Sequence, residues 1–121
     1  PEAFALVNAI VQGDAAGALG WLDRAMNRRG DEMMILGQLA WHARRTLHAS
    51  RLRDRGVPEK VVLKGANVWG NMIPPFKKLL GHRNTGRLEA DMRRVLETDL
   101  GMKTGNDPLA SLQTLVVSLL H

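Results

Sequence analysis

Histidine, cysteine and serine are the side chains that most often catalyse reactions or bind metals, and their placement here favours neither role. The four histidines are His42, His48, His82 and His121, and no two of them have a helical ligand spacing with a carboxylate to assist. The chain has no cysteine, which excludes a thiolate metal site. No serine, histidine and aspartate are spaced as a recognisable nucleophile and base. We therefore expect no catalytic residue, no metal and no cofactor.

One segment resembles a phosphate-binding loop in the spacing of its glycines: Gly81-His-Arg-Asn-Thr-Gly86-Arg87-Leu88. That loop requires a lysine and then a serine or threonine where Arg87 and Leu88 stand. Without the hydroxyl group the segment has no magnesium ligand, and no strand precedes it. The sequence therefore favours an ordinary turn and helix start over nucleotide binding.

An acidic residue falls on the inner face of a predicted helix near the C-terminus. The apolar stripe of this face has spacings of four and three and consists of Leu88, Met92 and Val95. Asp99 continues the stripe, and Lys103 stands one turn later, where it can pair with the carboxylate. Because a buried charge needs partners, we hypothesise that Arg44 or Arg45 pairs with Asp99 inside the bundle, with Lys103 as the outer partner.

Basic side chains follow one flank of the longest predicted helix at spacings of four, three and four: Arg44, His48, Arg51 and Arg55. Such a basic stripe can track nucleic-acid phosphates, contact a protein partner or face solvent. The formal net charge of +5 permits contact with a polyanion and does not require it. Aromatic residues make up 4% of the chain, which is a poor supply for a base-stacking platform. All three interpretations of the stripe stay open.

The elements that must position these residues are predicted to be helices throughout, since no run alternates as a strand does. Capping residues and glycine stops place helices at about 2–12, 14–28, 32–54, 85–102 and 108–120, with one or two short helices in between. Asp14, Asp31 and Asp107 are the expected N-caps, and Gly105 is the expected stop before the last helix. The predicted fold class is all-α, an orthogonal bundle of six or seven helices joined by short loops.

Two groups of apolar residues lie away from the main packing face of their helices. The last predicted helix is apolar over a wide arc, so it is either central in the bundle or sandwiched between the core and a partner, with Leu115 and Leu119 as candidate subunit-interface residues. Trp41, Met34 and Leu52 belong either to a second packing layer or to a patch that faces a partner.

The C-terminal string resembles the end of the delta subunit of the bacterial DNA polymerase III clamp loader. It reads Asp99-x-x-x-Lys103-x-Gly105, then Asp107-Pro108 and a leucine-rich final helix. The opening is similar to the start of that subunit's C-terminal helical domain and reads Phe4-x-Leu6-Val7-x-Ala9-Ile10, then Gly13-Asp14. Arg44-Arg45-x-Leu47 is like an Arg-x-Leu turn of the family, and the resemblance is weak from about 57 to 84.

The resemblance implies that residues 1–121 are a single helical C-terminal domain, a piece of a longer chain. In that family the domain joins those of the other clamp-loader subunits in a hetero-oligomeric, ring-shaped collar, which holds ATP-driven modules while they place the sliding clamp on primed DNA. The domain itself does no chemistry, and the N-terminal modules contact the sliding clamp and DNA. The expected setting is the cytoplasm, without a membrane, because no run approaches the roughly 20 apolar residues of a membrane span.

The alternative function is a basic helical module that binds nucleic acid through the basic stripe. Salt dependence separates the two, because phosphate contacts weaken steeply as salt rises. An enzyme of unknown type is a third hypothesis, and its sign would be an ordered pocket with convergent polar groups.

Overall fold

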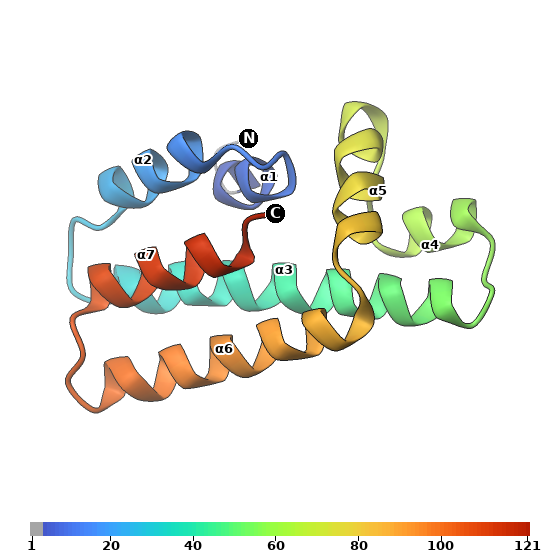
Figure 1. Ribbon diagram of the computed structural model, residues 1–121. Coiled ribbons are helices and arrows are strands. Elements are labelled where there is room, and N and C mark those ends of the chain that lie inside the picture. The colour runs from blue at the N-terminus through green and yellow to red at the C-terminus, as the bar shows by residue number, and fades with distance from the viewer. Residues whose placement is uncertain (1–3) are drawn as a thin grey trace.

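The computed structural model describes residues 4–121, and all regular structure in that range is helical, as predicted (Figure 1). The described helices are α1 (Ala5–Val11), α2 (Ala15–Ala25), α3 (Asp31–Asp54), α4 (Glu59–Gly65), the 3-10 turn η2 (Gly70–Met72), α5 (Ile73–His82), α6 (Thr85–Lys103) and α7 (Pro108–Leu119). The all-α bundle predicted from periodicity is therefore confirmed.

Short polar side chains fix where several helices begin. Asp14, Asn84 and Asp107 cap α2, α6 and α7, each accepting a hydrogen bond from the backbone N–H three residues later. The start of α3 differs from the prediction, because Gly30 occupies the cap position with a φ of 97° and Asp31 lies in the first turn. Asp31 instead accepts hydrogen bonds from backbone N–H groups of the preceding turn.

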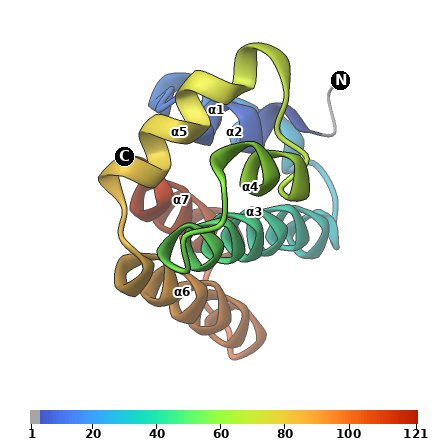
Figure 2. The same cartoon turned by 90° about the vertical axis from the view of Figure 1, so that its right-hand side faces the viewer.

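The two longest helices, α3 and α6, run antiparallel along one side of the molecule (Figure 1). Helix α7 lies against both of them, α2 packs against α7, and α1 packs against α2. Helix α5 crosses the direction of α3 steeply, which is visible in both views and agrees with the predicted orthogonal arrangement (Figure 2). Helix α4 packs beside the C-terminal half of α3. This framework brings the end of α7 close to the junction of α5 and α6.

Two clusters of buried side chains hold these helices together. The first lies between α1, α2, α3, α6 and α7, with Leu22, Leu39 and Leu112 fully buried at its centre. The second lies between α3, α4, α5 and the start of α6, around Phe76 and Leu79. Helix α1 contributes residues to both clusters and so joins them. Each fully buried side chain of this size contributes about 1.5–3 kcal/mol of transfer free energy.

The segment between α4 and α5 forms a tight turn. Asn67 and Gly70 adopt positive φ values of 57° and 63°, and between them Trp69 remains 74% exposed. Pro74 and Pro75 follow in the first turn of α5, where a helix does not need their missing backbone N–H groups. The turn therefore holds a large aromatic side chain at the surface between two short helices.

Candidate functional sites

The most deeply buried charges in the described chain form an ion pair between Arg83 and Asp91. Arg83 Nε donates to Asp91 Oδ2 at 2.8 Å and Arg83 Nη2 donates to Asp91 Oδ1 at 3.1 Å, so the contact is bidentate. Both side chains are 3% exposed. Two charges placed out of water in this way require good geometry and further hydrogen bonds.

The same guanidinium group holds the C-terminal end of the chain. Arg83 Nη1 donates to the carbonyl oxygen of Leu120 at 3.0 Å, and Nη2 also donates to the carbonyl oxygen of Ser118. Arg83 directly follows α5, Asp91 lies on α6, and the two carbonyl groups belong to the end of α7. One side chain therefore ties three helices together.

Sequence reasoning missed this ion pair, although the signal was present. Asp91 falls three residues after Leu88 and four before Val95, so it shares the inner stripe that was used to select Asp99. Arg83 lies within the glycine-spaced segment compared above with a phosphate loop. Its side chain is buried, and Asn84 caps α6, as expected for a turn and helix start.

The Asp99 hypothesis is half right. Lys103 Nζ donates to Asp99 Oδ2 at 3.0 Å, which confirms that pair. The pairing of Arg44 or Arg45 with Asp99 is wrong, because the described chain contains no such ion pair. Arg44 is exposed on the outer side of α3, and Arg45 extends toward the rings of Trp41 and Phe76.

The last helix, α7, occupies a central position in the bundle. Leu115 and Leu119 are each 2% exposed and belong to the first core cluster, so the prediction that they meet another subunit is wrong. Trp41 and Leu52 are partly buried against the second cluster, which confirms for these two the interpretation as a second layer. Met34 is half exposed.

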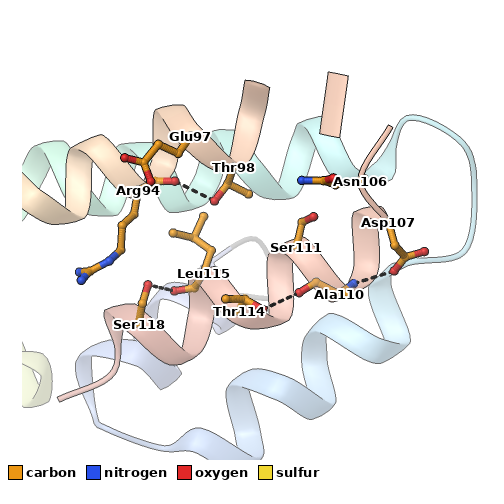
Figure 3. A pocket seen from close by; sticks show the side chains of 10 residues that line it. All are labelled: Arg94, Glu97, Thr98, Asn106, Asp107, Ala110, Ser111, Thr114, Leu115 and Ser118. Atoms are coloured by element: carbon orange, nitrogen blue, oxygen red, sulfur yellow. Dashed lines mark hydrogen bonds between the residues drawn. The ribbon is translucent and has the colours of Figure 1, made fainter. Parts of the chain in front are cut away.

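A groove of about 580 Å³ runs between α6 and α7 and is lined mainly by small polar side chains (Figure 3). The hydroxyl groups of Thr98, Thr114 and Ser118 donate to backbone carbonyls of their own helices. Asp107 is engaged as the cap of α7. No histidine, cysteine or lysine lines the groove. Within residues 4–121, moreover, no group of three or more potential metal ligands gathers.

Comparison with protein families decides what this bundle is. The family described as DNA polymerase III delta subunit, C-terminal domain, matches residues 1–119. The chain belongs to this family. The match also spans 57–84, where the resemblance from individual residues is weak. Comparison with curated proteins gave no match.

Belonging to this family implies a general role for the domain. The delta subunit is part of the clamp loader of DNA replication, and its C-terminal domain is a non-catalytic component that associates with the other clamp-loader subunits. In the described part of the chain no helix is both long and apolar enough to cross a membrane.

The delta-family domain exposes two leucines on the outer side of α6. Leu96 is 63% exposed and Leu100 is 64% exposed, and their spacing places them one turn apart on the same helix face. A salt bridge between Arg51 and Glu89 joins α3 and α6 at the surface. Arg44 and Leu96 are each seven residues from this pair, toward the same end of the two antiparallel helices.

All four residues of the basic stripe are exposed, as one flank of α3 requires. Arg51 Nη2 lies 3.4 Å from Glu89 Oε2, and this pair is about half exposed. Arg44, His48 and Arg55 form no ion pair within residues 4–121. An exposed pair of this kind contributes little to stability. Because the side chains of the stripe are exposed, they are available for contacts outside the domain.

Proposed function

We propose that this chain is the subunit-assembly domain of a clamp loader. It joins the equivalent domains of the other subunits in a hetero-oligomeric collar, which holds the ATP-driven modules in order while the sliding clamp is placed on primed DNA in the cytoplasm. The observation that carries this proposal is the family match over residues 1–119. Contacts with the sliding clamp and primed DNA are assigned to other modules of the delta subunit.

The outer face of α6 is the surface that we assign to a neighbouring subunit. Leu96 and Leu100 are large, apolar and exposed on one face, and such side chains are typical of the centre of a protein interface. Exposed charged residues neighbour them on α6, with Arg93 three residues before Leu96 and Glu97 three residues before Leu100. An apolar centre with a charged rim is the usual anatomy of such contacts.

The proposal is tested by co-purification with the other clamp-loader subunits. A Leu96→Lys/Leu100→Lys double variant should keep the helical content of the parent chain and lose retention by the other subunits. Val61→Lys is the matched control, because Val61 is an exposed apolar residue on α4, away from α6. Failure of the parent chain to associate with any clamp-loader subunit would contradict the proposal.

Nucleic-acid binding through the basic stripe is the second candidate, and the exposure of Arg44, His48 and Arg55 supports it. An Arg44→Gln/Arg55→Gln double variant should then lose affinity for a DNA duplex, and affinity of the parent chain should fall steeply with salt. Equal binding by both proteins at low salt would exclude the stripe as the binding surface.

A further inference from the structure

A pocket of about 380 Å³ opens between α1, α3 and the turn that precedes α5, far from the outer face of α6. Its walls are largely aromatic and apolar, formed by Phe4, Trp41, Trp69, Met72 and Phe76. Arg45 is the one cationic residue among those that line it. We call this site the Arg45 pocket.

Arg45 lacks a charge partner in the described chain. Its guanidinium carbon lies 4.6 Å from the centre of the Trp41 ring and 5.0 Å from that of Phe76. Nη1 reaches one carbonyl oxygen, that of Ala66, at a long 3.5 Å, and the buried Nε has no hydrogen-bond partner. Burial lowers the pKa of Arg45 to about 10, so the group is still charged at neutral pH. A desolvated cation without a charge partner favours an anion that would supply one.

Three carboxamide side chains add neutral polar groups to the same pocket: Asn8, Asn67 and Asn71. None of them hydrogen-bonds through its side chain to another residue of the described chain. A carboxamide offers both a donor and an acceptor, which matches the alternating groups of a peptide backbone. Trp69, the most exposed of the large apolar side chains, stands at the rim between Asn67 and Asn71.

We propose that the Arg45 pocket binds a segment of a partner protein in which a carboxylate side chain stands next to an aromatic residue. The carboxylate would accept hydrogen bonds from the Arg45 guanidinium group, the aromatic ring would pack among Trp41, Trp69 and Met72, and the carboxamides would hold the backbone. Arginine is suited to this role because its planar guanidinium group binds carboxylates with two parallel hydrogen bonds.

The observations favour a peptide over single-stranded nucleic acid. A strand of nucleic acid needs a row of cations along its phosphates, whereas the Arg45 pocket contains a single enclosed guanidinium group. Lys60 and Lys64 lie beyond Trp69 and line a separate hollow of about 270 Å³. A nucleic-acid ligand would recruit these lysines, so they distinguish the two cases.

The test uses the capped dipeptide N-acetyl-aspartyl-phenylalanine amide and the indole N–H signals of the three tryptophans in NMR spectra of the full 121-residue chain. Addition of the dipeptide should shift the signals of Trp41 and Trp69 in a saturable way. Trp21 packs against the first core cluster, outside the pocket, and its signal is the internal reference. The N-acetyl-asparaginyl counterpart should bind about tenfold more weakly, because it lacks the charge that Arg45 needs.

Two variants complete the experiment. Arg45→Gln should remove the preference for the aspartyl over the asparaginyl dipeptide, and Trp69→Ala, at an exposed position, should weaken binding while the fold is kept. Equal affinity of the parent chain for both dipeptides, or no shift of Trp41 and Trp69, would overturn the proposal. So would shifts produced by a thymidine oligonucleotide and not by the dipeptide, abolished by Lys60→Gln/Lys64→Gln. Neither result depends on whether the domain assembles with clamp-loader subunits.

Discussion

Arg83 and Asp91 form a bidentate ion pair inside the bundle, with Arg83 Nε 2.8 Å from Asp91 Oδ2. Because Arg83 also donates to the carbonyls of Ser118 and Leu120, this pair connects the start of α6 with the end of the chain. The position of α7 against α3 and α6 therefore depends on one buried guanidinium group as well as on apolar packing.

Removing either member of the buried pair should be strongly destabilising. Asp91→Asn and Arg83→Met should each lower the free energy of unfolding by about 3–5 kcal/mol, because each leaves an uncompensated charge or unpaired polar groups in the interior. Urea denaturation followed by circular dichroism measures this. A double Arg83→Met/Asp91→Leu variant should lose less than the sum of the single changes. Additive losses would show that the two residues act independently.

The Asp99 and Lys103 pair should contribute much less than the buried pair. Lys103 is 60% exposed, so Lys103→Ala should change the free energy of unfolding by less than about 1 kcal/mol. The measurement is the same urea titration, repeated at high salt, where the difference between variant and parent should shrink further. A loss as large as that of Asp91→Asn would mean that Asp99 carries a structural charge after all.

His42 should make the domain less stable in mild acid. It is buried on α3, and desolvation, helped by the nearby charges of Arg45, Arg83 and His121, lowers its pKa from 6.5 to about 3. As pH falls below 6.5, the unfolded chain takes up a proton that the folded chain does not bind. The His42 contribution should therefore cost up to about 1.4 kcal/mol per pH unit, or about 2 kcal/mol between pH 7 and pH 5.

The measurement for His42 is the free energy of unfolding from urea titrations across that pH range. His42→Leu removes the titrating group and should flatten this part of the pH dependence, since the carboxylates titrate mostly at lower pH. An unchanged slope in the variant would show that another group binds the proton.

Truncation of a leucine should cost much more stability on α7 than on the outer face of α6. Leu115→Ala should lower the free energy of unfolding by about 2–5 kcal/mol, because Leu115 is enclosed by the first core cluster. Leu96→Ala should leave stability nearly unchanged, because its side chain is mostly in solvent. Thermal unfolding of the Leu115→Ala and Leu96→Ala variants measures both effects. Comparable losses would contradict the placement of Leu96 on an open surface.

Local features of this protein could be predicted from its sequence with good accuracy. The helix starts at Asp14 and Asp107 depend on a side chain and a backbone N–H only three residues apart. Asp99 and Lys103 pair for the same reason, since residues four apart on a helix are neighbours whatever surrounds them. Such interactions need no knowledge of how helices pack.

Only the packing of the helices decides which of two chemically similar residues is buried with a partner. Asp91 and Asp99 share one stripe of α6, but only Asp91 lies where Arg83 and the end of α7 meet. Arg45 likewise packs between two rings supplied by α3 and α5, which no local spacing indicates. Helical periodicity tells which side of a helix is buried, whereas the partner across the bundle depends on how distant helices cross. Local patterns in the chain thus indicated the family and the helices, whereas the packing of distant helices set which charges are enclosed and which leucines remain exposed.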